Sequence, residues 1–328
     1  MTKARIPEID IMKGIAILCV ILEHIDNCPE ILKHLITSFH MPLFFIIAGF
    51  FYRPQNCYKE KFKKDLNRLI IPYIATMAIL SAYSFFIHFI LKSDHSRAYL
   101  TFWCCLFPSG IKGSSLSNSV PVWFLCALFW CRQIYNLIFV KYNKPIAILL
   151  IVIISSSVTF LYEETSIEFP LSFIQGISAM TFYLFGWFIR QFLDRHNLNA
   201  SFLILTWIIW LTCFQYCGIG MITCYYNNFF LALVVAVCGT FSIYSISKII
   251  SNVFTISIMR YVKYYLKWAG ISSLVILCVH TIEWYLPIWD YIGLYSVIPL
   301  FLAKVVLCSV ITLLCYKTKI TRSIFQLK

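Results

Sequence analysis

Residues 7–25 read PEIDIMKGIAILCVILEHI, a run in which apolar side chains predominate. An α-helix needs about 20 mostly apolar residues to cross the hydrocarbon core of a bilayer. The run superficially resembles a signal peptide, because basic residues precede it. However, it contains Asp10, Lys13 and Glu23 and lacks a small-x-small cleavage site. We therefore expect it to remain in the protein as a membrane-spanning helix.

The whole chain of 328 residues has this apolar character, with 60% apolar and 12% charged residues. A soluble globular protein has about 25% charged residues, so too few charges remain to cover a soluble surface. Disorder requires low hydrophobicity and is also excluded. The composition predicts an all-α polytopic integral membrane protein with about ten transmembrane helices, at roughly 7–25, 38–53, 69–91, 121–140, 145–161, 170–189, 200–217, 228–247, 269–289 and 297–316.

The distribution of basic residues predicts the orientation of these helices. If the amino terminus is cytoplasmic, 20 of the 27 Lys and Arg residues fall in inner loops and four in outer loops. This asymmetry follows the positive-inside rule, and an even number of spans places the carboxyl terminus in the cytoplasm as well. We expect a multi-pass protein of the plasma (inner) membrane, with residues 1–328 forming a single transmembrane domain and no appended soluble domain.

The net charge of +13 does not indicate a nucleic-acid partner, because basic cytoplasmic loops account for it. Most of the 14 cysteines lie in apolar runs, and no Cys-x-x-Cys pair occurs. This pattern indicates neither a disulfide framework nor a zinc site. We therefore predict no metal, and the sequence leaves the oligomeric state open.

Ionisable residues inside the predicted spans are the candidate functional groups, because a charge in the hydrocarbon costs about 2.5 to 3.5 kcal/mol. Eleven residues separate Lys13 from His24, which is about three helical turns, so both lie on one stripe roughly 16 Å apart. Asp10 precedes Lys13 by three residues and is expected to pair with it. Lys13 then lies near the cytoplasmic end of the first span and His24 near its outer end.

Three other predicted spans carry polar groups to the same outer level. His40 begins the second span, Trp123 begins the fourth, and His280 and Glu283 lie three residues apart in the ninth. For each of these residues a structural role remains an alternative: a helix cap, a place in the aromatic belt, or a buried ion pair. His24 could similarly be an interfacial histidine that is hydrogen-bonded to water.

Two further buried cations need partners. Lys304 could neutralise Glu283 or Glu23, and Arg132 could pair in the inner half of the membrane. The basic cluster from Lys59 to Arg68 is expected to contact anionic lipid headgroups on the cytoplasmic side. Attraction of a phosphorylated substrate to this cluster is an alternative.

The run EIDIMKGIAI at residues 8–17, followed by Glu23-His24, resembles the opening signature of the acyltransferase-3 family of membrane-bound O-acyltransferases. In that signature a basic residue is followed, after ten others, by a histidine. The resemblance continues in family order through FHMPLFF at 39–45, AGF at 48–50, RLIIPY at 68–73, VWFL at 122–125 and the helix that contains His280.

This resemblance implies a ten-helix core that moves an acyl group, usually acetyl from cytoplasmic acetyl-CoA. The acceptor it implies is a sugar hydroxyl of a cell-surface or exported glycan or glycolipid. The essential histidine of the family corresponds to His24, and its basic partner to Lys13, where Arg is commoner and would offer a bidentate fork. A paired-arginine motif is reduced here to Arg68, with Asp65 in the first position, and Ala48 replaces a frequent serine.

These expectations form a hypothesis about the reaction. A neutral imidazole can take the proton of an attacking hydroxyl near neutral pH, so His24 would act as a base, or would accept the acyl group first. Lys13, with Arg68, would bind the anionic end of acyl-CoA at the inner mouth.

The remaining candidate residues would support His24. Glu23 or Glu283 would orient its imidazole and stabilise the cation that forms, and His280 competes for that role. Asp10, His40 and Trp123 are predicted to support the acceptor site or the structure. The predicted partners are acyl-CoA, a carbohydrate or glycolipid acceptor and the lipid bilayer.

Two other functions remain open from the sequence. A transporter, or a flippase for a lipid-linked sugar, also uses intramembrane His, Lys and Glu residues, and broken helices or an inverted repeat would favour it. A scaffold for a glycan-assembly complex would tolerate replacement of the intramembrane charges. Clustering of polar groups at the outer helix ends favours the acyltransferase.

Overall fold

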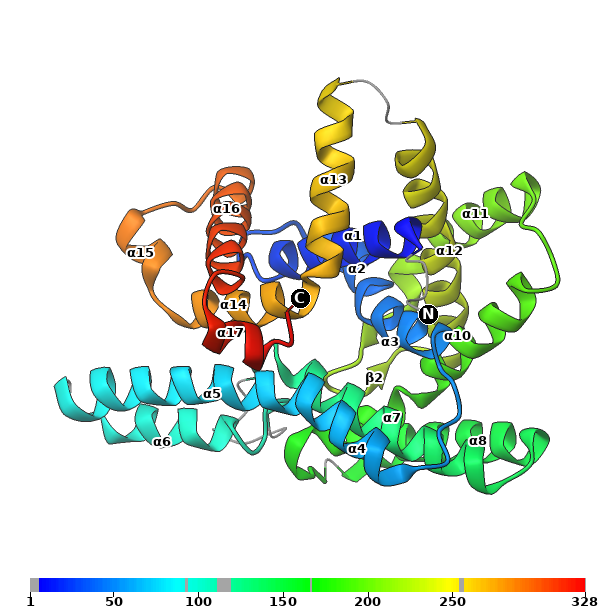
Figure 1. Cartoon of the computed structure of the whole chain (residues 1–328), viewed down its shortest axis with the longest axis horizontal. Coiled ribbons are helices and arrows are strands. Elements are labelled where there is room, and N and C mark those ends of the chain that lie inside the picture. Colours follow the sequence, from blue (N-terminus) through cyan, green and yellow to red (C-terminus); the bar gives the residue numbers. More distant parts are fainter. Residues whose placement is uncertain (1–5, 92–93, 111–118, 166, 254–256, 328) are drawn as a thin grey trace.

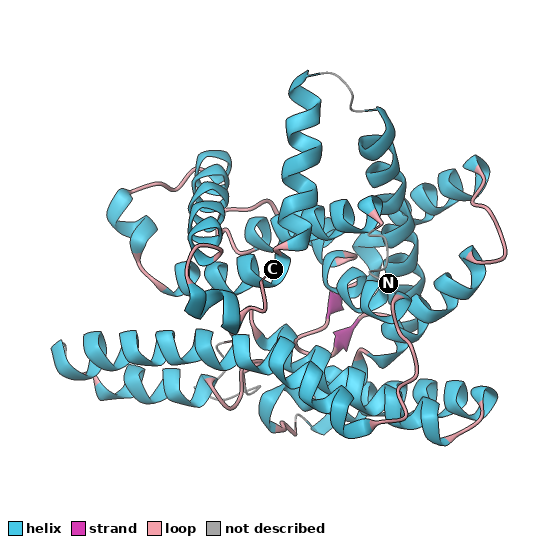
Figure 2. Cartoon of the chain, in the orientation of Figure 1, coloured by secondary structure: helices cyan, strands magenta, loops and turns pink. Residues whose placement is uncertain are grey.

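The computed structural model describes residues 6–91, 94–110, 119–165, 167–253 and 257–327. Within these ranges the chain is almost entirely helical, with one short antiparallel hairpin (Figures 1 and 2). The all-α prediction is therefore confirmed.

The helices and strands follow one another as α1 (Pro7–Glu23), α2 (Glu30–Thr37), α3 (His40–Phe50), α4 (Tyr58–Asp65), the π-helical η1 (Leu66–Ile70), α5 (Ile71–Ser84), the π-helical η2 (Phe85–Leu91), α6 (His95–Cys104), α7 (Trp123–Lys141), α8 (Lys144–Thr165), the 3₁₀ turn η3 (Pro170–Ser172), α9 (Phe173–Ser178), α10 (Met180–Leu193), α11 (Ala200–Cys217), β1 (Ile219–Gly220), β2 (Tyr225–Tyr226), α12 (Phe229–Val253), α13 (Ser257–Ile271), α14 (Ser273–Tyr285), α15 (Ile288–Ile292), α16 (Val297–Cys315) and α17 (Lys319–Ile324).

Among the described residues, seven helices are long and apolar enough to cross a membrane, or up to nine if each of two bent helix pairs is one span. A multi-pass membrane protein is thus supported, whereas the number of ten spans is not confirmed. The second predicted span, 38–53, is α3 with only 11 residues, and it reaches a spanning length only together with α2. Helix α1 has 17 residues, the short end of the spanning range.

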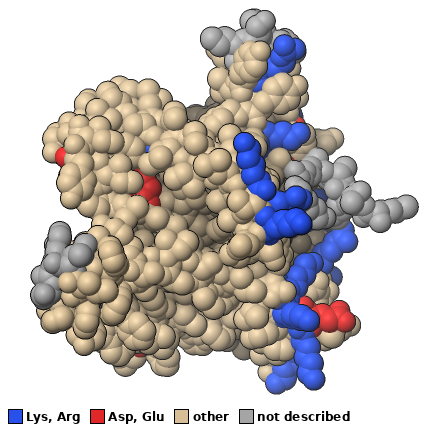
Figure 3. Space-filling model, turned by 60° about the vertical axis from the view of Figure 1, so that its left-hand side comes forward, with Lys and Arg blue, Asp and Glu red and all other residues tan. Residues whose placement is uncertain are grey.

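Helix α16 shows how the helices meet the lipid. Its buried residues, Leu300, Lys304, Cys308 and Thr312, recur every four positions and form one stripe that faces the bundle. Its other faces expose large apolar side chains such as Val306. Figure 3 shows Lys and Arg gathered along one edge of the molecule, next to a broad neutral surface. A neutral apolar surface of this kind is suited to lipid contact.

Helix α1 lies in the middle of the helix bundle, and α13 crosses it at very close range (Figure 1). A Cβ atom on Gly14 would lie 2.0 Å from the backbone oxygen of Leu266, and one on Gly270 would lie 1.7 Å from that of Asp10. Only glycine permits this approach, as in other closely packed membrane helices. The contact fixes the end of α1 that carries Asp10 and Lys13.

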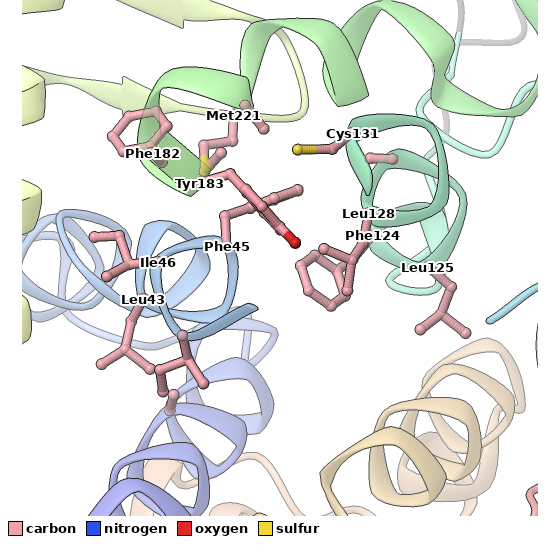
Figure 4. Packing of buried hydrophobic residues seen from close by; sticks show 14 of the residues in the cluster. Leu43, Phe45, Ile46, Phe124, Leu125, Leu128, Cys131, Phe182, Tyr183 and Met221 are labelled. Carbon is pink, nitrogen blue, oxygen red and sulfur yellow. The ribbon is translucent and has the colours of Figure 1, made fainter. Parts of the chain in front are cut away.

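An aromatic core lies between α3, α7 and α10 (Figure 4). The rings of Phe45 and Phe124 meet edge to face, with centroids 5.1 Å apart, and Tyr183 packs beside them from α10. Aromatic pairs in this geometry stabilise the packing beyond the area they bury. Because α3 and α7 are held together here, their first residues, His40 and Trp123, are held in position as well.

Candidate active site

His24 immediately follows the last residue of α1 and has a defined orientation. Its Nδ1 lies 2.7 Å from the carbonyl oxygen of Val20. A carbonyl only accepts hydrogen bonds, so Nδ1 carries the proton and Nε2 of the neutral ring carries the lone pair. The ring also makes edge contacts with the rings of His280 and Trp284, at centroid distances of 5.2 and 5.7 Å. The arrangement leaves Nε2 as the nitrogen that can act as a base.

Glu23 and His40 form a pair beside His24. Oε2 of Glu23 lies 2.9 Å from Nε2 of His40, and Nδ1 of His40 lies 2.8 Å from the carbonyl oxygen of Ile36. Both ring nitrogens of His40 therefore face oxygen atoms of neighbouring groups. His40 is buried at the start of α3 and holds the Glu23 carboxylate there.

A buried polar chain runs behind His24 through α14 and α16. Nδ1 of His280 lies 2.9 Å from Oε2 of Glu283, and Nζ of Lys304 donates to Oε1 of the same carboxylate at 2.6 Å. The indole nitrogen of Trp289 also donates to Oε1. Of the two partners expected for Lys304, Glu283 or Glu23, the structure shows Glu283. Nε2 of His280 is buried without a hydrogen-bond partner among the described residues.

Two cavities meet at His24. One has a volume of about 210 Å³, and its wall includes Glu23, His24, His40 and Trp123 together with residues 219–222 of the hairpin; we call it the hairpin cavity. The other has a volume of about 280 Å³ and is lined by residues 24–27 and by part of the segment 284–304; we call it the aromatic cavity. His24 belongs to both walls and therefore lies between the two cavities.

A third cavity, of about 390 Å³, lies at the Lys13 end of α1, and we call it the inner cavity. Lys13, Arg68 and Arg132 all contribute to its wall. The ammonium of Lys13 lies 2.8 Å from Oδ1 of Asp10, which confirms the predicted local pair. Three cationic side chains therefore lie in the wall of the inner cavity. Of these, Lys13 was the one predicted to pair with a residue of its own helix, Asp10.

The inner cavity adjoins the hairpin cavity. Val20, Met41 and Leu277 belong to the walls of both. These three side chains come from α1, α3 and α14, the helices that also position His24, His40 and His280. These apolar side chains thus lie between the inner cavity, which has Lys13 in its wall, and the hairpin cavity, which has His24 in its wall.

Asp65 organises the cationic wall of the inner cavity. Its carboxylate is almost completely buried and accepts hydrogen bonds from Lys61 and Gln133, each at 2.8 Å, while Nη2 of Arg132 lies 2.8 Å away. The expectation that Arg132 has a pairing partner is confirmed, and its place in the inner half of the membrane stays a prediction. Arg68 follows on the π-helical turn η1, a distortion that is frequent at functional sites. Desolvated charges this close stabilise one another only as a complete network.

The structure brings the predicted residues together in two groups. His24, Glu23, His40, Trp123, His280 and Glu283 lie around the histidine end, whereas Lys13, Arg68 and Asp10 lie at the inner cavity. The partner of the His24 Nδ1 is the carbonyl of Val20, while Glu23 pairs with His40 and Glu283 with His280. Among the described residues, no carboxylate is therefore hydrogen-bonded to His24, and the orienting role of Glu23 or Glu283 stays a prediction.

Sequence reasoning missed the role of Trp284 beside His24, the hairpin, and Arg132 as a wall of the inner cavity. The spacing of Lys61 and Asp65 by four residues in a basic helix was the available signal for the Asp65 network. Nothing local in the sequence connects residues 219–222 to His24.

His280, Glu283 and Cys308 place potential metal ligands within 4.8 Å of one another. However, the Glu283 carboxylate already contacts the ammonium of Lys304. The positive charge of Lys304 would repel a metal ion bound to the same Glu283 carboxylate. The absence of a metal therefore stays a prediction.

Comparison with known proteins agrees with this architecture. Residues 6–317, nearly the whole chain, match the family described as an acyltransferase domain. No curated protein and no solved structure matches the chain. The matched region contains every residue of both groups described above. The chain therefore belongs to the acyltransferase-3 family and is a membrane acyltransferase.

Proposed function

We propose that this protein transfers an acyl group, most simply acetyl, from acyl-CoA to a hydroxyl of a cell-surface or exported carbohydrate or glycolipid. We place it in the plasma (inner) membrane. The observation that carries the proposal is the pair of adjoining cavities, one with Lys13, Arg68 and Arg132 in its wall and the other with His24.

The inner cavity suits the donor. Phosphate groups bind most strongly to guanidinium and ammonium donors, and acyl-CoA carries several phosphates at one end. The Arg132 side chain is 22% exposed although its Nη2 contacts Asp65, so part of it remains accessible to a ligand. The uncharged arm of acyl-CoA would then pass the apolar boundary of Val20, Met41 and Leu277, which brings the thioester to His24.

His24 supplies the base for direct transfer. Its Nε2 takes the proton of the acceptor hydroxyl while that oxygen attacks the thioester carbonyl carbon. The carbon–sulfur bond breaks, and the CoA thiolate recovers the proton from the imidazolium, giving an ester and free CoA. Alternatively, Nε2 attacks the carbonyl carbon first and expels the CoA thiolate. The acceptor hydroxyl then attacks the acyl-imidazolium, its proton passes to the thiolate, and His24 is released. Both routes need the lone pair on Nε2, and the Nδ1 bond to Val20 leaves it there.

One observation also fits a transporter. Helices α13 and α14, over residues 259–285, meet at 81°, and α9 and α10 meet at 49°; discontinuous helices mark substrate sites in many transporters. Here the sharper bend has a role in the acyltransferase as well, because Gly270, Ile271 and Ser273 line the inner cavity. Membership of the acyltransferase family favours the enzyme.

Intact mass spectrometry of surface glycans and their lipid-linked precursors tests this proposal. Glycans from cells with the gene should carry the added mass of an acyl group, and glycans from cells without the gene should lack it. A transporter or flippase would instead change how much glycan reaches the surface without changing its mass. Identical masses in both strains would contradict the proposed transfer.

A further inference from the structure

The segment after α14 builds the aromatic cavity against His24. Four aromatic residues, Trp284, Tyr285, Trp289 and Tyr295, contribute to its wall, together with the acidic residues Asp26 and Asp290. Helix α15 and the loop after it lie beside α16 at one end of the molecule (Figure 1). The cavity therefore combines flat apolar surfaces with hydrogen-bond acceptors next to the proposed base.

The two tryptophans are held in place by contacts of their own. Trp284 meets the ring of His24 edge to face and is 38% exposed, so part of its indole remains available. Trp289 donates its indole N–H to Glu283, and the ammonium of Lys304 lies 5.4 Å from its ring centroid. A rigid aromatic wall loses little conformational entropy when a ligand packs on it.

Aromatic faces and carboxylates together recognise one ligand chemistry well. The C–H faces of a pyranose ring pack on aromatic rings, and its hydroxyls donate to carboxylate oxygens, which only accept. Pockets of a few hundred Å³ with a few polar groups among apolar ones are typical small-molecule sites. The aromatic cavity thus has the size and the lining expected for a sugar unit.

The charges in the cavity indicate that this sugar is neutral. Asp26 and Asp290 lie in the wall, while the ammonium of Lys304 is engaged by Glu283. Lys33 donates to the backbone carbonyl of Asp26 and lies 3.9 Å from the carboxylate of Glu30. Like charges close together repel, so a phosphorylated or carboxylated sugar would be disfavoured here.

We propose that the aromatic cavity binds an uncharged sugar unit of the acceptor and presents its hydroxyl to Nε2 of His24. This inference rests on the proposed function and adds the acceptor site to it. The donor reaches His24 from the hairpin cavity, which adjoins the inner cavity, whereas the acceptor reaches it from the aromatic cavity. His24 is the residue at which the two routes meet.

The first test measures binding without turnover. Purified full-length protein in lipid nanodiscs is photo-crosslinked with a diazirine-bearing octyl glucoside, and the adducts are mapped by peptide mass spectrometry. Adducts are expected in residues 24–27 and 284–295, and unlabelled octyl glucoside should compete better than octyl glucuronide. Adducts confined to other segments, labelling no higher than background, or equal competition by the anionic glucuronide would overturn the inference.

The second test uses Trp284→Ala and Asp290→Asn in cells, with surface glycan acylation as the readout. Trp284→Phe, which keeps an aromatic ring, should restore much of the Ala defect. Trp103→Ala and Glu164→Gln serve as matched controls, because both residues are exposed and line none of the three cavities described above.

Both cavity variants should lower acylation roughly tenfold, the effect of about 1.4 kcal/mol, while acetyl-CoA binding by the purified variants stays within about twofold of wild type. If the cavity variants acylate as well as the controls do, the acceptor site is elsewhere although the proposed function stands. If wild-type cells show no acylated glycan at all, the proposed function itself fails.

Discussion

Replacing Lys304 with Met removes the cation that contacts the buried carboxylate of Glu283 at 2.6 Å. The side chains of Lys304 and Glu283 are only 5% and 1% exposed. Met has a similar length and no charge, so the variant leaves the carboxylate buried with His280 and Trp289 as its remaining donors. We expect this protein to be strongly destabilised, and the second substitution Glu283→Gln to recover part of the loss.

The geometry sets the size of the effect. Two opposite charges about 3 Å apart attract each other by about 5 to 6 kcal/mol at an effective dielectric constant of about 20. Removing one partner of a buried pair usually costs about 3 to 5 kcal/mol. Because two donors to Glu283 remain, we expect Lys304→Met to lower the free energy of unfolding by about 3 kcal/mol. The double variant should show a coupling energy of about 2 kcal/mol.

The free energy of unfolding can be measured by titrating the purified protein in mixed micelles with sodium dodecyl sulfate while tryptophan fluorescence is followed. Lys33→Met is the matched control, because Lys33 lies 3.9 Å from Glu30, whose side chain is 80% exposed. Loss of an exposed pair costs less than about 1 kcal/mol.

Two results would refute this reasoning. One is a Lys304→Met protein no less stable than Lys33→Met. The other is simple additivity of the costs of Lys304→Met and Glu283→Gln in the double variant, because groups that interact directly do not contribute independently.

Three further predictions concern the inner cavity and the crossing of α1 with α13. Lys13→Gln should weaken acetyl-CoA binding roughly tenfold in calorimetry, because a charged donor to phosphate is lost. Lys13→Arg keeps the charge and should bind acetyl-CoA with wild-type affinity. If Lys13→Gln also binds with wild-type affinity, Lys13 is not part of the donor site. Arg132→Gln should likewise weaken acetyl-CoA binding about tenfold, with Arg132→Lys intermediate, and unchanged binding would limit Arg132 to a structural role. Gly14→Val should lower the yield of monodisperse protein in size-exclusion chromatography, because a Cβ at this position would lie 2.0 Å from the backbone oxygen of Leu266. The control is Ala200→Val at an exposed position. Equal yields of the two variants would argue against the close crossing of α1 and α13.

The sequence was informative wherever helix geometry alone determines the arrangement. The apolar runs predicted a helical membrane protein, and the spacing of Asp10 and Lys13 predicted their ion pair. His24 and His40, which the sequence placed at one level, line the same cavity because both lie at the ends of helices that meet there. These features depend on residue spacing along one helix, or on the side of the membrane at which a helix begins.

Long-range packing determines what the sequence did not predict. The pairing of Arg132 with Asp65 requires α7 to pack against the end of α4, and the close crossing of α1 depends on Gly270 in a helix that follows far along the chain. The partner of His24 Nδ1 is a backbone carbonyl, which any residue at position 20 would supply. Bent helices also shorten or merge apolar runs, so the number of spans could not be counted from hydropathy.

The central role of His24 is tested most directly by the acyl content of surface glycans in cells that produce His24→Gln. His34→Gln is the matched control, because His34 is an exposed histidine on the neighbouring helix α2. At equal membrane abundance, the His24 variant should leave the glycans without the acyl group, and the His34 variant should acylate them as wild type does. Glycans that remain acylated in cells with His24→Gln would contradict the account.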